Sequence, residues 1–250
     1  MRYNRSMEVQ IAVAKVKKYA TSESGDTLEV VERPNGGLSV VLADGQSSGR
    51  GAKRISNMVV RKVIALLAEG VRDGAAARAA SDYLFTERQG RVQATLNILS
   101  ADLQTRTLVV TRNNPAPVVV RAGGKLLHLD EESTPVGIYR GTRPVVTELP
   151  LEIGMTVIMF TDGIVHAGAR YGRHLDLETT LQALFAPADE EDAEGIPLPP
   201  PADTLAEALL QTAMRLDEGR PTDDISVVVL QVVPHQEDVR VRRMLVRLPL

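Results

Sequence analysis

Leu38-Ser-Val-Val-Leu-Ala-Asp44-Gly45 is an aliphatic run that ends on an Asp-Gly pair, and the chain repeats the pattern further along. Val157-Ile-Met-Phe-Thr-Asp162-Gly163 ends in the same way, and Asp223-Asp224 opens the aliphatic run 225–230. Such runs, bounded by Asp and Gly, are typical of buried β-strands that meet turns. Antiparallel pairing would bring the carboxylates to one edge of a sheet, where they repel one another unless a hard cation binds them. The pattern therefore indicates a Mg²⁺ or Mn²⁺ site.

A simpler explanation exists for each acidic pair taken alone. An Asp-Gly pair after one strand is ordinarily only a turn, because both residues favour turn backbone conformations. Asp223-Asp224 fits this explanation less well, since two adjacent carboxylates that enter a buried strand lose their hydration. Neutralisation by Arg220 is the alternative to a bound cation, and residue spacing alone leaves both open.

The order of the remaining periodic segments predicts the fold class. Turn-bounded β-like runs occur at 9–16, 27–32, 94–99, 107–111, 117–121, 125–129, 145–149, 155–160 and 239–248. Apolar residues recur at helical spacing over 55–67, 74–87, 175–185 and 204–216. We expect the four consecutive runs within 94–129 to form a meander. Strands and helices come in groups and do not alternate, so we predict an α+β fold with two antiparallel sheets and helices packed outside them.

Composition restricts the chemistry that the chain can carry out. It has 250 residues, no Cys and four His. The absence of Cys excludes disulfides, zinc–thiolate sites, iron–sulfur clusters and cysteine catalysis. A metal ion would be held by oxygen ligands, which favours Mg²⁺ or Mn²⁺. The length and the ample aliphatic content predict a single domain over residues 1–250.

Charge and hydropathy restrict the partners. The net charge is −3, which argues against a general nucleic-acid binder, and no apolar stretch approaches the length of a bilayer span. With no signal-peptide core at its start, the chain is expected to be cytoplasmic, without a nucleic-acid or membrane partner. The acidic, proline-rich stretch 187–203 predicts a mobile loop. The Arg-rich run 239–248 predicts an edge strand protected by charge.

Several segments, taken in order, resemble the motifs of the metal-dependent (PPM-type) protein serine/threonine phosphatases, in particular the stage II sporulation E-like branch. The segments that carry the resemblance are Ser24-Gly25-Asp26, Asp44-Gly45 with Ser47-Ser48-Gly49-Arg50-Gly51, Ala94-Thr95-Leu96 with Asn113-Asn114-Pro115, Pro135-Val136-Gly137, Thr161-Asp162-Gly163-Ile164 and Asp223-Asp224-Ile225-Ser226. Each motif alone is weak. The ordered set, from about residue 24 to 232, is specific.

The resemblance implies a four-layer α-β-β-α sandwich with a pair of Mn²⁺ or Mg²⁺ ions at the sheet edge. By motif position, Asp44 would bridge both ions, and the Gly45 carbonyl would bind one of them. Asp26 would serve that same ion, directly or through water. Asp162 and Asp223 would hold the other.

The implied activity is hydrolysis of phosphoserine or phosphothreonine on a regulatory protein. Asp44, Asp162 and Asp223 would be the catalytic residues, since they would hold the ions that activate a metal-bridging water. The resemblance suggests a phosphorylated partner in bacterial signalling or stress response, such as an anti-sigma-factor antagonist or a stress-signalling scaffold. Two alternatives remain: a catalytically silent binding module with this fold, and a phosphoesterase of small molecules.

Neighbouring positions are expected to support the ions or the substrate, and these are Asp224, Gly49, Arg50, Gly51, Gly163 and His166. His166 stands where the branch usually has Glu, and it is either a substrate contact or a solvated loop residue. Arg50 replaces a usual His, and it is either a phosphate ligand or a surface Arg. Gly49 and Gly51 are expected to let the backbone approach the site at a helix N-terminus.

Overall fold

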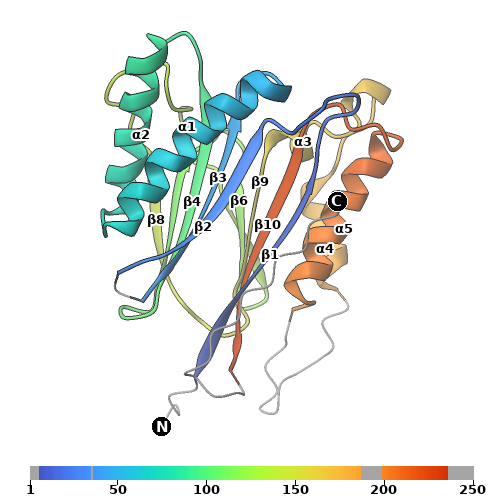
Figure 1. Cartoon of the computed structure of the whole chain (residues 1–250). Coiled ribbons are helices and arrows are strands. Elements are labelled where there is room, and N and C mark those ends of the chain that lie inside the picture. The colour runs from blue at the N-terminus through green and yellow to red at the C-terminus, as the bar shows by residue number, and fades with distance from the viewer. Residues whose placement is uncertain (1–5, 35, 187–198, 236–250) are drawn as a thin grey trace.

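The computed structural model describes residues 6–34, 36–186 and 199–235. Two five-stranded antiparallel sheets stack face to face in it, with helices outside both (Figure 1). The first sheet has the strand order β1 (Met7–Val16), β10 (Ile225–Pro234), β9 (Thr156–Phe160), β6 (Val118–Ala122) and β7 (Lys125–Leu129). The second has the order β2 (Asp26–Glu32), β3 (Leu38–Gly45), β4 (Ala94–Asp102), β5 (Thr107–Asn113) and β8 (Val145–Pro150). The predicted α+β sandwich is confirmed.

Two helix pairs form the outer layers. Helices α1 (Gly49–Ala68) and α2 (Asp73–Arg88) cover the second sheet, and α4 (Leu177–Phe185) and α5 (Ala202–Leu216) lie on the side of the first (Figure 1). The short α3 (Asp162–Val165) follows β9, and a 3₁₀ turn spans Ala169–Tyr171. No helix within the described ranges is long and apolar enough to cross a membrane.

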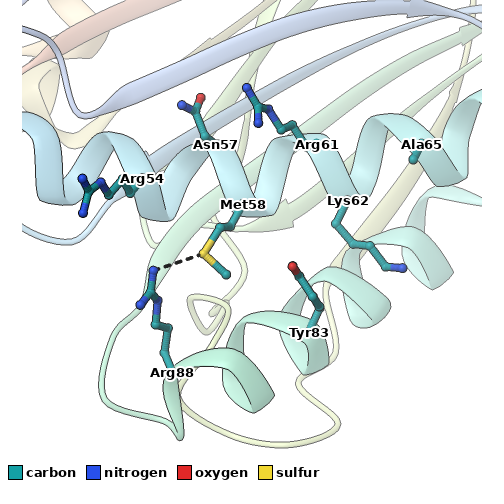
Figure 2. A pocket seen from close by; sticks show the side chains of 8 residues that line it. All are labelled: Arg54, Asn57, Met58, Arg61, Lys62, Ala65, Tyr83 and Arg88. Carbon is teal, nitrogen blue, oxygen red and sulfur yellow. Dashed lines mark hydrogen bonds between the residues drawn. The ribbon is translucent and has the colours of Figure 1, made fainter.

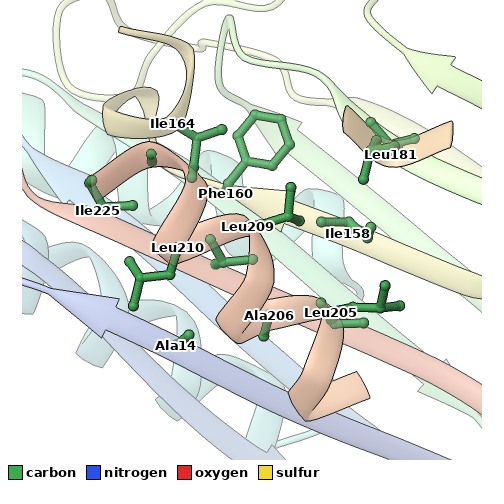
Figure 3. Packing of buried hydrophobic residues seen from close by; sticks show 14 of the residues in the cluster. Ala14, Ile158, Phe160, Ile164, Leu181, Leu205, Ala206, Leu209, Leu210 and Ile225 are labelled. Carbon is green, nitrogen blue, oxygen red and sulfur yellow. The ribbon is translucent and has the colours of Figure 1, made fainter. Parts of the chain in front are cut away.

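The aliphatic strands are buried on both faces, which explains their nearly continuous apolar sequence. Along β3, Val40 and Leu42 point into the core between the sheets, whereas Val41 and Ala43 pack under α1. This alternation follows from the two-residue period of a strand. In the first sheet, Ile158 of β9 belongs to the core beneath α5 (Figure 3).

Helix α1 forms because its apolar residues fall on one face. Ile55, Val59, Val63 and Leu67 are all buried against the second sheet, as the spacing predicted. The helix ends before Gly70, whose φ of +84° is the left-handed conformation that glycine adopts easily after a helix.

The two Asp-Gly pairs are not turns, and that part of the prediction was wrong. Asp44 and Gly45 are the last two residues of β3, while Asp162 and Gly163 open α3. The glycine at position 45 is explained by close packing of the backbone and not by a turn. A Cβ on Gly45 would lie 2.0 Å from the Ala52 carbonyl oxygen, so glycine is needed to let α1 approach the strand.

The predicted meander was also wrong, because its four strands divide between the sheets. β4 and β5 pair in the second sheet, and β6 and β7 pair in the first. The chain crosses between sheets at 114–117, where Pro115 has no backbone N–H with which to continue a strand. Strand periodicity shows that a segment is a strand but not which partner it chooses.

Two predicted segments fall wholly or partly on residues that the structure leaves undescribed. The predicted strand 239–248 lies outside the described residues, as do residues 187–198 of the predicted loop 187–203. The described end of that loop departs from the prediction, since Ala202 and Asp203 already belong to α5. The Pro200 carbonyl accepts a hydrogen bond from Gln231 Nε2 at 2.7 Å. A single domain over 1–250 stays a prediction.

Candidate metal centre

The predicted carboxylates gather where the ends of the two sheets meet. Asp44 ends β3 of the second sheet, and Asp162 and Asp223 flank β9 and β10 of the first. All three line one cavity of about 250 Å³, together with Lys18 and Thr95. The sequence-based expectation of a single sheet edge was therefore too simple, because the cavity draws its acids from both sheets.

Asp26 lies directly across the sheet from Asp44. The two residues are register partners in the antiparallel pair β2–β3, so their side chains lie on the same face. Asp26 is fully buried, and its Oδ2 accepts hydrogen bonds from Ser226 Oγ at 2.6 Å and Thr161 Oγ1 at 3.2 Å. These bonds tie β2 to the ends of β9 and β10. Asp26 thus joins the two sheets at the cavity.

Two carboxylate oxygens at this junction are buried without a hydrogen-bond partner. They are Oδ1 of Asp26 and Oδ1 of Asp162. A buried acceptor without a donor is costly, and native proteins rarely retain one without a reason. Carboxylate oxygens of this kind are ligands for hard cations, so the side chains present fit a Mg²⁺ or Mn²⁺ ion.

The electrostatics of the cluster agree with a missing positive charge. Burial, followed by the charges of Asp26 and Asp162, raises the pKa of Asp44 to about 9. Burial likewise raises the pKa of Asp26 against the opposing hydrogen bond from Ser226. Burial is also the main cause of the raised pKa of Asp223. Without a cation the cluster retains protons, and a cation would displace them.

The side chains do not already form a closed ligand set. In residues 6–34, 36–186 and 199–235, no group of three or more His, Asp or Glu side chains is arranged closely enough to hold a metal ion. Several acids share one cavity, but a bound ion would have to draw them together. Their individual roles as ligands are therefore treated as a proposal below.

Two lysines converge on the backbone of Asp26, a feature that no sequence motif indicated. Lys15 Nζ and Lys53 Nζ each donate to the Asp26 carbonyl oxygen at 2.6 Å. Burial lowers the pKa of both, and the charge of Lys53 lowers the pKa of Lys15 further. Lys18, which lines the cavity itself, was missed for the same reason: a lysine near a strand end carries no distinctive local pattern.

Asp224 orients the backbone around the cavity. Its Oδ1 accepts from the Lys18 backbone N–H at 2.9 Å, and its Oδ2 accepts from the Gly25 N–H at 2.8 Å. These bonds hold the loop that carries Asp26. Arg220, the alternative neutralising partner, instead places its guanidinium over the Tyr19 ring at 5.4 Å.

The remaining predicted residues lie at the margin of the cavity. His166 Nε2 is 4.0 Å from Asp162 Oδ2, and its side chain is 64% exposed. Arg50 is 82% exposed, with its Nε 3.8 Å from Glu23 Oε1. A Cβ on Gly49 or Gly51 would meet no atom within 4 Å, so neither glycine is required by crowding. Gly49 is explained instead by its φ of +67°.

Gly163 is required by close packing. A Cβ there would lie 2.2 Å from the Asp224 carbonyl oxygen. This glycine lets the start of α3 approach the start of β10, and so brings Asp162 near Asp223.

The Asn113-Asn114 segment supports the backbone at the sheet crossing. Asn113 Nδ2 donates to the Thr134 carbonyl at 2.9 Å, and Asn114 Oδ1 accepts from the Ala116 N–H at 2.9 Å. Arg112 beside them is almost fully buried and donates to the backbone carbonyls of Asn114, Ala116 and Glu131. Sequence reasoning missed Arg112, because an Arg in a strand is ordinarily exposed.

Comparison with known proteins identifies relatives of this chain. A family model described as "Stage II sporulation protein E (SpoIIE)" matches residues 34–233. Stage II sporulation protein E of Bacillus subtilis (strain 168) is 22% identical over 229 residues, which is 91% of this chain and 26% of that protein. The Priestia megaterium protein is 22% identical over 225 residues, 90% of this chain and 36% of that protein. The chain thus spans about a quarter to a third of these relatives.

Solved structures share the fold. The PP2C phosphatase domain with a regulatory fragment of Bacillus subtilis SpoIIE has a TM-score of 0.74 at 21% identity, covering 94% of this chain and 66% of that chain. The RsbU and RsbW domains of a Mycobacterium tuberculosis protein give 0.71 at 22% identity, with coverage of 91% and 61%. The catalytic domain of the phosphatase PstP, in complex with two manganese ions, gives 0.67 at 16% identity, with coverage of 91% and 100%.

Proposed function

The chain belongs to the stage II sporulation protein E (SpoIIE) family, and we propose that it hydrolyses phosphoserine or phosphothreonine on a regulatory protein. The observation that carries the proposal is the cluster of acids at the junction of the sheets. Asp26 and Asp162 each present a buried, unpartnered oxygen there, and Asp44 has a pKa of about 9. A structural acid cluster with no ligand has no reason to retain such repulsion.

The proposed site holds a pair of Mn²⁺ or Mg²⁺ ions. Asp44 suits the shared position because the charges of both Asp26 and Asp162 act on it. The Gly45 carbonyl and Asp26 would complete one side, and Asp162 and Asp223 the other. The chemistry that such a pair supplies is the lowering of a shared water's pKa and the neutralisation of phosphoryl oxygens. Related structures are those of PstP in complex with two manganese ions and RsbX in complex with magnesium, which supports this choice of metals.

The chain's own residues would bind and orient the substrate around this centre. Lys18 places a cation in the wall of the cavity, and Ser47 and Ser48 line it just before the N-terminus of α1. A helix N-terminus favours an anion through its free N–H groups. Asp224 would hold the loop of Asp26 in place, as its two backbone hydrogen bonds indicate. The chain contains no Cys, so no thiol nucleophile takes part.

The proposed partner is a phosphorylated regulatory protein in a cytoplasmic signalling pathway. The similarity to the RsbU and RsbW domains, and to a structure from work on the bacterial stressosome, supports a role in such signalling. An anti-sigma-factor antagonist or a stress-signalling scaffold would present a surface phosphosite to the open cavity.

The test is hydrolysis of p-nitrophenyl phosphate with added Mn²⁺. We expect turnover by wild type, abolition by EDTA, and a loss of about 100-fold or more in Asp44→Ala and Asp223→Ala. Glu152→Gln, which changes an exposed carboxylate in the turn before β9, is the matched control and should keep wild-type turnover. Equal rates in all variants would refute the proposal.

Two further measurements separate the alternatives. A panel of phosphopeptides, nucleotides and sugar phosphates distinguishes a protein phosphatase from a small-molecule phosphoesterase. Absence of turnover, with a partner affinity that does not respond to EDTA, would identify a silent binding module.

A further inference from the structure

A groove of about 580 Å³ runs between the two helices that cover the second sheet (Figure 2). Helix α1 contributes Arg54, Asn57, Met58, Arg61, Lys62 and Ala65 to its lining, and α2 contributes Tyr83 and Arg88. We call it the α1–α2 groove. Its walls combine cationic side chains with apolar surface, although the chain as a whole has a net charge of −3.

Among the residues that the structure describes, the cations of the groove have no carboxylate partner. No ion pair between residues that the structure describes involves Arg54, Arg61, Lys62 or Arg88. Arg88 Nη2 donates instead to the Met58 sulfur at 3.5 Å, and Lys62 Nζ lies 5.8 Å from the centre of the Tyr83 ring (Figure 2). A thioether and an aromatic face are weak partners for a cation, so a carboxylate could displace both.

The groove begins close to the carboxylate cavity. Ser48 lines the cavity just before α1 starts, and Arg54 follows one and a half turns later. At the other helix, Arg88 ends α2 five residues before Gln93, which also lines the cavity. The loops meet there, because the Gln93 N–H donates to Gln46 Oε1 at 3.0 Å. One bound polypeptide could therefore occupy both places.

We propose that the α1–α2 groove docks an acidic, partly apolar segment of the phosphoprotein substrate while the phosphorylated residue enters the cavity. The cations of the groove favour acidic side chains in the bound segment, and the apolar lining favours aliphatic ones. Aliphatic side chains can pack on the apolar surface of Met58, Ala65 and Tyr83. A polypeptide carries such side chains, whereas a nucleic-acid backbone does not. The inference rests on the proposed function for the identity of the substrate but not for the existence of the docking site.

The geometry sets a spacing between the two parts of the substrate. From Gly49 to Lys62 the helix advances thirteen residues, about 20 Å. An extended peptide covers that distance in about six residues. The acidic segment should therefore lie about six to ten residues from the phosphorylated residue.

Direct binding tests the groove without any requirement for catalysis. A fluorescein-labelled Asp/Glu-rich peptide is titrated with the full chain and followed by anisotropy. We expect saturable binding that weakens with NaCl, and affinity at least about tenfold lower in Arg61→Glu/Lys62→Glu. Arg61→Gln/Lys62→Gln gives a milder version should charge reversal impair folding. Arg78→Gln/Lys125→Gln removes two exposed cations outside the groove and should bind like wild type.

Two results of the binding experiment would overturn the proposal. One is a loss of specificity: the groove variants bind the acidic peptide as tightly as the control variant does, or wild type binds a neutral Asn/Gln peptide of the same length equally well. The other is tighter binding of a single-stranded oligonucleotide, which would assign the groove to nucleic acid.

Kinetics then tests the link to the substrate. Phosphothreonine peptides carry the acidic segment 2, 8 or 20 residues from the phosphate, chosen to bracket the spacing above. We expect the lowest KM at the middle spacing, and Arg61→Gln/Lys62→Gln should lose this advantage while keeping its turnover of p-nitrophenyl phosphate. A KM independent of spacing would refute substrate docking. If the proposed phosphatase activity itself is wrong, wild type hydrolyses none of these substrates, yet anisotropy still reports the groove.

Discussion

Asp44→Asn should stabilise the metal-free protein while it removes the metal-dependent activity. Burial of the Asp44 carboxyl, together with the negative charges of Asp26 and Asp162 nearby, raises its pKa to about 9. Asparagine keeps the size and hydrogen-bonding capacity of the side chain but carries no charge and no titrating proton. The repulsion that opposes folding is then relieved.

The magnitude follows from the shift in pKa. In the unfolded chain the carboxyl titrates near its ordinary pKa of 3.8, so at pH 7 folding requires it to take up a proton. The interval from 3.8 to 7 corresponds to about 4 kcal/mol as an upper limit. Solvent reaches the half-buried side chain and screens part of this, so we expect a gain of about 1–3 kcal/mol in the free energy of unfolding. For a chain of this size each kcal/mol raises Tm by about 2–4 °C.

The sign of the pH dependence makes the prediction specific. A carboxyl whose folded-state pKa is raised contributes stability that is fully present below 3.8 and is lost as pH rises toward about 9. The advantage of Asp44→Asn over wild type should therefore be small near pH 4.5 and largest near pH 9.

Urea unfolding in EDTA from pH 4.5 to 9 provides the assay. Glu152→Gln, which removes an exposed carboxylate, should stay within about 0.5 kcal/mol of wild type. Added Mn²⁺ should raise the stability of wild type but not of Asp44→Asn, because only a folded state that binds the ion gains from it. An Asp44→Asn protein that is no more stable than wild type at any pH in EDTA would refute the reasoning.

Three further substitutions test the surroundings of the site. Gly163→Ala should cost about 3 kcal/mol or more and abolish Mn²⁺-dependent turnover, because its Cβ would lie 2.2 Å from the Asp224 carbonyl oxygen; a wild-type Tm would contradict this packing. Arg112→Met should lower the free energy of unfolding by about 2–4 kcal/mol in urea titrations, because two buried backbone carbonyls and one partly buried carbonyl lose their donor; a change below 0.5 kcal/mol would count against it. His166→Ala should change kcat for p-nitrophenyl phosphate by less than about threefold, because the side chain is 64% exposed, and a tenfold loss would instead give His166 a part in proton transfer.

Periodicity and turn chemistry were sufficient to predict most elements of this fold. The aliphatic strands were recognisable because burial on both faces demands apolar residues at every position, as in β3 and β9. Helix α1 was recognisable because Ile55, Val59, Val63 and Leu67 must share one face. These are local consequences of the strand and helix repeats, so they need no knowledge of the partner.

The acidic residues of the candidate site could also be proposed in advance, because their motifs follow one another in the order that the family resemblance implies. The cavity that these acids share could not be predicted from the sequence. Pairing decides that β3 belongs to one sheet and β9 and β10 to the other, and hence that Asp44 meets Asp162 and Asp223 between two sheets. Strand pairing depends on non-local contacts, which the local sequence does not determine.

The sequence by itself determined the elements, the aliphatic cores and the identity of the acids, because each of these reflects a local requirement for burial or charge. Only the tertiary structure decided what surrounds those acids. It placed Lys15 and Lys53 on the carbonyl of Asp26, left one oxygen of Asp26 unpartnered, and gathered the cations of the α1–α2 groove between two helices. These arrangements join residues far apart in the chain, and their distances are set by how sheets and helices pack.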